Sequence, residues 1–269
     1  MFPWNDEFHW TAGHIIFLSL FFAVVLTILT TLVAAIWHTV SEFRENRAAR
    51  TSWKQTFEAL PEEERRCRHQ LAGRVLSRIC DNAFDCCHCE KYTEFAALPA
   101  RIPSPNPGLD YSDKLLYHRA HTWVQPQEDG TFTIGLDEFA GHLIGKPDSM
   151  ELPAKGNRLE SNAIAWRMKK NGHLIQVRAP LDGTVVATGG NGDGWYLRVR
   201  PQAPVNLRHL LHGPEVPRWL AGEVQRLQLQ LSAPDKPCLA DGGVLKPELM
   251  DALPEADWDG VLAATFLET

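Results

Sequence analysis

The longest uninterrupted apolar run lies near the start of the chain, over residues 13–37, and contains no Asp, Glu, Lys or Arg. At about 1.5 Å per residue, a helix of this length exceeds a hydrocarbon core of roughly 30 Å. The residues before it include Asp6 and Glu7 but no Lys or Arg, whereas a secretory signal peptide begins with a basic region. The pattern therefore predicts one transmembrane helix over 13–37, preceded by a short extracytoplasmic segment, residues 1–12.

Basic residues lie on one side of this run only. The four that follow it closely are Arg44, Arg47, Arg50 and Lys54. Because cytoplasmic flanks of membrane helices carry an excess of Lys and Arg, we expect the N-terminus outside and the rest of the chain at the cytoplasmic face of the inner membrane. Residues 38–66 mix acidic and basic side chains with helical spacing, which predicts a polar juxtamembrane stalk.

The pattern changes three times after the stalk. Residues 67–97 hold five of the six cysteines, and residues 98–113 contain four prolines, as a linker does. Residues 114–231 begin with short alternating strands broken by Asp-Gly and Asn-Gly pairs and end with helical spacing. In the tail, residues 232–269, one amphipathic stretch is expected to pack back on this domain. The predicted fold class is a mainly β domain with C-terminal helices, preceded by a transmembrane helix and a small Cys-rich module.

The amino-acid composition indicates a folded protein but does not indicate a particular function. An apolar fraction of 44% and a charged fraction of 22% are typical of a folded chain, and the net charge of −6 gives no reason to expect a nucleic-acid partner. No Ser-His-Asp set and no Gly-rich phosphate loop occurs in a supporting context. We therefore expect the protein not to be an enzyme.

Several motifs in residues 116–201 occur in the order and at the spacing found in one family. They are His121-Thr122-Trp123-Val124, the turn Asp129-Gly130, the segment APLDGTV at 179–185 and the pair Gly194-Trp195. Together they resemble the H protein of the glycine cleavage system. The resemblance implies a lipoyl/biotinyl-type barrel-sandwich hybrid. It also implies a lysine at a hairpin tip whose amine forms an amide with lipoate.

The position of that lysine is occupied by a different residue. In the family it lies seven residues before the Ala-Pro pair, and here this position is Gly172, preceded by Asn171. Asn-Gly favours a two-residue type I′ turn, because both turn positions require positive φ. We expect the domain to lack lipoate, with Lys169 and Lys170 as weak alternative acceptors.

The cysteines form the second candidate site. Four of them have the spacing C-x12-C-x5-C-x2-C, namely Cys67, Cys80, Cys86 and Cys89. Thiols stay reduced in the cytoplasm, and four of them can bind structural Zn²⁺ or an iron–sulfur cluster. Spare ligands are Cys87, His69 and His88. Buried free thiols are the alternative. The stretch resembles one that precedes the β domain in some membrane-anchored, H-protein-like bacterial proteins.

These observations predict a membrane-anchored scaffold or adaptor that binds a protein partner. Its β domain would carry no lipoate, and its Cys-rich module would bind a metal. Two alternatives remain open from the sequence. One is an electron-transfer or redox-sensing subunit with an iron–sulfur cluster on the cysteines, and the other is a lipoyl carrier with an unusual acceptor lysine.

Overall fold

The computed structural model describes residues 11–103, 105–106, 108–190, 194–202, 205–231 and 245–267. The chain divides into two compact units, residues 1–48 and 49–269, which are treated separately below. Most of the predicted extracytoplasmic segment and the first part of the predicted tail, residues 232–244, lie outside the described residues.

Helix α1 covers Ala12–Ala59 and contributes to both units. Most of its apolar side chains described in the first unit are exposed, including those of Phe17 and Leu26. The Thr27 hydroxyl inside the run donates to Ala23 O at 2.8 Å, so this polar group is satisfied within the helix, as a membrane span requires. Residues 12–34 are long and apolar enough to cross a membrane. The predicted apolar helix is confirmed, and it could serve as a membrane anchor or a signal sequence.

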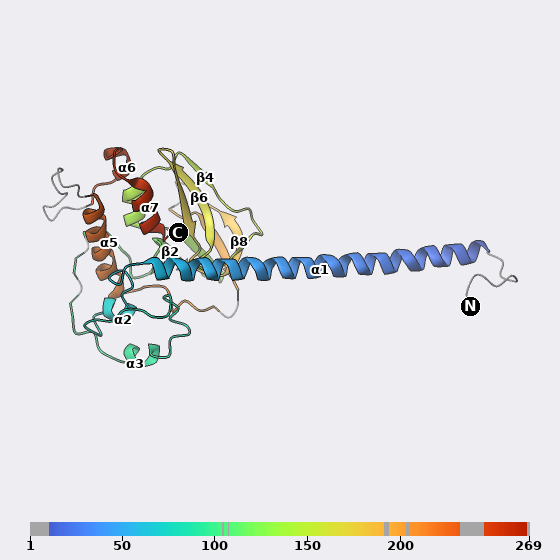
Figure 1. Ribbon diagram of the computed structural model, residues 1–269, viewed down its shortest axis with the longest axis horizontal. Coiled ribbons are helices and arrows are strands. Elements are labelled where there is room, and N and C mark those ends of the chain that lie inside the picture. The colour runs from blue at the N-terminus through green and yellow to red at the C-terminus, as the bar shows by residue number, and fades with distance from the viewer. Residues whose placement is uncertain are drawn as a thin grey trace. The chain divides into compact units, whose positions relative to one another are not determined.

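Two antiparallel sheets form the middle of the second unit (Figure 1). The six-stranded sheet has the order β1 (Leu116–Tyr117), β2 (Thr122–Pro126), β3 (Phe132–Leu136), β9 (Leu197–Pro201), β8 (Gly183–Thr188) and β5 (Arg158–Leu159). The three-stranded sheet has the order β4 (Ser149–Glu151), β6 (Ile164–Lys170) and β7 (His173–Arg178). The predicted mainly β domain is therefore confirmed.

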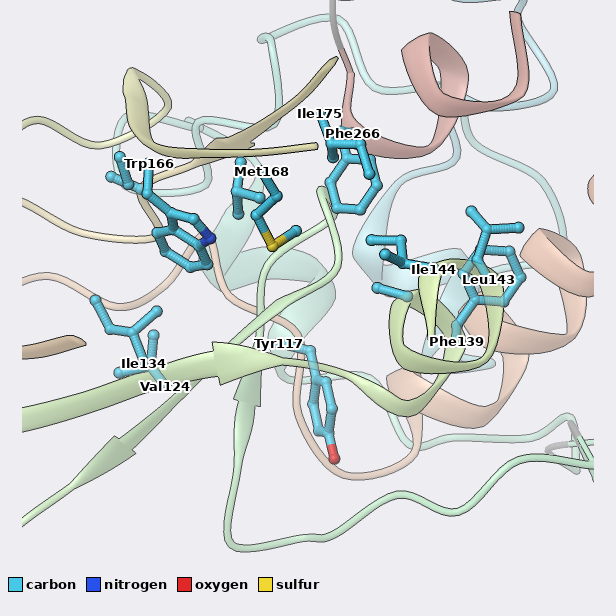
Figure 2. Close-up of a cluster of buried hydrophobic side chains, with 14 of the residues drawn as sticks. Tyr117, Val124, Ile134, Phe139, Leu143, Ile144, Trp166, Met168, Ile175 and Phe266 are labelled. Carbon is cyan, nitrogen blue, oxygen red and sulfur yellow. The ribbon is translucent and has the colours of Figure 1, made fainter. Parts of the chain in front are cut away.

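Helices complete this domain. The short helix α4 (Glu138–Ile144) begins at Asp137, whose carboxylate accepts a hydrogen bond from Ala140 N at 2.9 Å. Helices α5 (Glu215–Leu231), α6 (Leu249–Ala252) and α7 (Trp258–Phe266) follow the last strand. Figure 2 shows Phe266 of α7 near Ile175 of β7 in the buried cluster. The described part of the tail thus packs back on the domain, as expected.

The cysteine-rich region has little regular structure. It contains helix α2 (Arg68–Leu71) and helix α3 (Tyr92–Ala96), and one isolated bridge joins Arg66 to Ile79. A small second core connects it to its surroundings, with members Trp53, Phe57, Phe84, Ala120 and Leu267. These residues come from α1, the cysteine-rich region, the β domain and the chain's end, so the last turns of the predicted polar stalk are partly buried.

Candidate functional site

The hairpin between β6 and β7 contains Gly172, the position where the H-protein resemblance implies the lipoyl lysine. Lys170 pairs directly with His173, which leaves Asn171 and Gly172 as a two-residue turn with φ of 52° and 85°. The predicted turn with two positive φ angles is confirmed. A Cβ added at Gly172 would meet no atom within 4 Å, so space is available at the tip and the missing group is the amine itself.

Side chains from other elements hold this hairpin tip, residues 170–173. Asn171 N donates to Asp148 Oδ2 at 2.7 Å, and Asn171 Nδ2 donates to Asp251 Oδ1 at 3.0 Å. His173 Nδ1 lies 2.7 Å from Asp259 Oδ1 on α7. Hydrogen bonds from Lys170 and Asn171 hold the pKa of Asp251 below its ordinary value. The tip is therefore bound to the C-terminal helices.

The two lysines near the tip differ in environment. Lys170 is buried, and its Nζ donates to Asp251 Oδ2 at 2.7 Å. Lys169 points to the opposite face of β6 and is exposed. Of the two weak alternative acceptors, only Lys169 presents its amine to solvent.

The second candidate site is a cavity of about 20 Å³ in the cysteine-rich region, which we call the cysteine cavity. Its lining includes the four predicted thiols, Cys67, Cys80, Cys86 and Cys89, and also Arg68, His69, Arg119 and His209. A cavity of this size holds roughly one water-sized occupant. The structure thus brings the four predicted cysteines to one place.

Backbone pairing explains how the first two cysteines meet. Cys67 N donates to Arg78 O at 2.8 Å, and Cys80 N donates to Arg65 O at 2.6 Å. These antiparallel bonds close the intervening loop, so the C-x12-C spacing places both thiols on one cavity.

A tight turn places the third cysteine. Ala83 and Phe84 have φ of 46° and 58°, and the Asn82 amide donates to Asp85 O at 2.7 Å. The buried Phe84 ring anchors this turn in the second core. The Phe-Asp pair before Cys86 therefore has a structural role.

The three spare candidate ligands differ in whether they line the cysteine cavity. His69 lines the cavity, whereas Cys87 does not, and His88 is exposed with its Nδ1 2.6 Å from Asp85 Oδ2. As the side chains stand, no three His, Cys, Asp or Glu residues in the described part of the chain are arranged to hold an ion. The thiols surround the cavity without converging on one point.

Burial governs the protonation of these thiols. It raises the pKa of Cys80, and it raises that of Cys86 to about 12 although Arg68 and Arg119 oppose the shift. These two thiols are therefore protonated at neutral pH, and a bound cation would have to displace their protons.

His69 is a buried imidazole without a hydrogen bond. It is 3% exposed, and neither ring nitrogen has a hydrogen-bond partner within the described structure. Its ring lies 5.3 Å from that of Tyr92 and 5.7 Å from that of Phe95. Burial, together with neighbouring arginines, lowers its pKa to about 4, so the ring is neutral.

A buried ion pair connects the cysteine-rich region to α5. Arg68 Nε and Nη2 lie 3.0 and 2.7 Å from the two oxygens of Glu215, with side chains 2% and 6% exposed. Burial alone would lower the pKa of Arg68, but Glu215 raises it above its ordinary value. Neither Arg68 nor Arg119 could be predicted as a site residue, because nothing in the local sequence pattern distinguishes them from surface arginines.

Another buried charge lies at His121, in the motif that opens β2. Its Nδ1 is 2.8 Å from Asp137 Oδ2, its Nε2 is 3.8 Å from Glu223 Oε2, and its ring stacks between Phe139 and Trp219. Burial would lower its pKa, but the two carboxylates raise it to about 9. His121 therefore serves as a buried cation between the β domain and α5.

Comparison with known proteins shows which family the β domain is similar to. Residues 115–191 match the family model "Glycine cleavage H-protein". The glycine cleavage system H protein of Shewanella halifaxensis is 33% identical over 114 residues, which cover 36% of this chain and 86% of that protein. That of Neisseria meningitidis is 30% identical over 124 residues, 41% of this chain and 94% of that protein.

A crystal structure of the Mycobacterium marinum H protein has 20% sequence identity and a TM-score of 0.35, covering 43% of this chain and 99% of that one. The sequence matches define a domain of the H-protein class, within a chain that adds an apolar helix and C-terminal helices. The chain belongs to the glycine cleavage H-protein family.

Proposed function

We propose that this chain is a membrane-anchored, non-enzymatic scaffold whose H-protein-like domain, a barrel-sandwich hybrid, binds a protein partner and carries no lipoate. The observation that supports this most directly is Gly172 at the acceptor position. Lipoate is joined through an amide to a lysine amine, and glycine offers none. The Asn-Gly turn keeps the hairpin geometry without that amine.

The surroundings of the hairpin support the same conclusion. A carrier arm must reach into the active site of a partner, which requires a tip that is free to approach it. Here the tip residues are bonded to α6 and α7, and Lys170 is buried in an ion pair with Asp251. Lys169 is exposed but lies off the tip, on the other face of β6.

The apolar part of α1 would anchor this scaffold. Its exposed apolar surface is larger than a soluble monomer leaves in water, and lipid would cover it. The basic residues after the span support a position of the H-protein-like domain on the cytoplasmic side, where thiols stay reduced. A single-pass protein with its N-terminus outside agrees with both observations.

We further propose that Cys67, Cys80, Cys86 and Cys89 bind one Zn²⁺ ion. Four thiols are the donor set of a structural zinc site, and the cysteine cavity has room for about one atom. Binding would require the thiols to lose their protons and turn inward. Because His209 and Leu211 also line the cavity, the ion would fasten the cysteine-rich region to the H-protein-like domain.

The same thiols could instead hold an iron–sulfur cluster in an electron-transfer or redox-sensing subunit. The small cavity favours a single ion, because a cluster adds several iron and sulfide atoms. Metal analysis of anaerobically purified protein separates the two functions. We expect colourless protein with one zinc per chain, whereas brown protein containing iron would support the redox subunit.

The carrier question is tested by the mass of the denatured full-length protein, expressed in cells that supply lipoate and attach it to H proteins. We expect the mass of the unmodified chain. The Shewanella halifaxensis H protein, expressed in the same cells, is the positive control. A lipoyl-sized increase that maps to Lys169 or Lys170 would contradict the proposal.

A further inference from the structure

Arg119 of the H-protein-like domain faces the cysteine cavity. It lies in the loop between β1 and β2 and also lines a neighbouring cavity of about 130 Å³ beside Glu223. Its guanidinium carbon lies 4.0 Å from the centre of the Phe84 ring, and its Nη2 donates to Arg66 O at 2.8 Å. These contacts hold the guanidinium against the turn that precedes Cys86.

Arg119 forms no hydrogen bond or ion pair with a carboxylate in the part of the chain that the structure describes. Arg68, on the same cavity, is neutralised by Glu215. Glu223 attracts Arg119 electrostatically without forming an ion pair with it, and this carboxylate is shared with Arg226 and His121. A guanidinium taken out of water without a counter-charge is unfavourable.

The cysteine cavity could supply Arg119 with a further counter-charge. With one divalent ion, four thiolates sum to a formal charge of about −2, three thiolates and one histidine to about −1, and two thiolates and two histidines to about zero. The four-thiolate centre would supply the most negative counter-charge for Arg119. Burial lowers the pKa of Arg119, and the charges that oppose this shift are those of Cys80 and Cys86 when ionised, followed by those of Glu223 and Cys67.

We propose that Arg119 is the counter-charge of an anionic metal–tetrathiolate centre in the cysteine cavity. This inference rests on the proposed zinc site and specifies its chemistry: all four ligands are thiolates, and His69 is not one of them. Arg119 is a positioning residue that acts on the ligands through its charge. Because it belongs to the β1–β2 loop, the H-protein-like domain itself would set the affinity of the metal site.

The test measures Zn²⁺ affinity of the full-length protein in detergent, by competition with a chromophoric chelator. Removing a group that supports metal ligands typically weakens binding by about 10- to 100-fold, and we expect Arg119→Gln to do so. Arg119→Lys keeps the charge and should retain most of the affinity. Arg167→Gln removes an exposed arginine of β6 and should leave the affinity unchanged.

Co²⁺ substitution gives an independent readout, since its absorption reports the number of thiolate ligands. We expect a four-thiolate spectrum in the wild type and in His69→Ala. The inference is overturned if Arg119→Gln binds Zn²⁺ as tightly as the wild type, or if the lysine and glutamine variants lose affinity equally. Failure of the wild type to bind either metal would instead refute the zinc site itself.

Discussion

Glu215→Ala removes the carboxylate that neutralises Arg68 inside the second unit. Arg68 Nε and Nη2 lie 3.0 and 2.7 Å from the carboxylate oxygens of Glu215, and both side chains are almost wholly buried. Glu215 Oε2 also accepts a hydrogen bond from His212 N at 3.2 Å. The substitution would leave a guanidinium buried without a partner. It would also loosen the connection between the cysteine-rich region and α5.

The magnitude follows from burial. Removing one partner of a buried ion pair costs about 3–5 kcal/mol. In a folded unit of this size, each kcal/mol lowers the melting temperature by about 2–4 °C, so the expected decrease is about 6–20 °C. Glu58→Ala is the matched control, because its 3.8 Å pair with Lys54 is exposed and is worth about 0.5 kcal/mol or less.

The assay is thermal unfolding of the full-length protein in detergent, followed by tryptophan fluorescence. A double variant, Arg68→Met with Glu215→Leu, should recover most of the lost stability, because it leaves no charge without a partner. A melting temperature for Glu215→Ala equal to that for Glu58→Ala would refute the assigned role of this pair.

Three further outcomes are expected. The stability that the His121 charge contributes is present below pH 6.5 and is lost as the pH rises through about 9, by up to about 3 kcal/mol. In urea unfolding, the free energy of unfolding of His121→Gln should therefore decrease less between these pH values than that of the wild type. Asp251→Ala should speed hydrogen exchange at the hairpin tip, and unchanged exchange would contradict the assigned contacts. Joint replacement of Cys86 and Cys89 by serine should abolish zinc binding measured by elemental analysis, whereas Cys87→Ser should not, because Cys87 does not line the cavity.

Features encoded by neighbouring residues could be predicted from the sequence. The apolar run predicted the long helix, and the alternation of apolar and polar residues predicted the β domain. The pair Asn171-Gly172 predicted a turn with two positive φ angles. The cysteine spacing pointed to four thiols that do line one cavity. In each case the physical requirement is local: a periodicity, a turn geometry or a short loop.

Features that depend on distant residues could not be predicted. Asp251, which fixes the hairpin tip, is 81 residues from Lys170, and Glu215 is 147 residues from Arg68. The burial of Trp53 in the predicted polar stalk has the same origin, since its neighbour Phe84 comes from another segment. The local sequence around a charged or aromatic residue does not show whether its side chain is buried, because burial depends on a partner from a distant segment.

The mass of the full-length protein under native and denaturing conditions tests the central claim most directly, because it reports the carrier group and the metal together. The proposed function predicts the mass of the unmodified chain when denatured and that mass plus one zinc ion when native. A denatured mass increased by a lipoyl group, with no metal in the native protein, would contradict it.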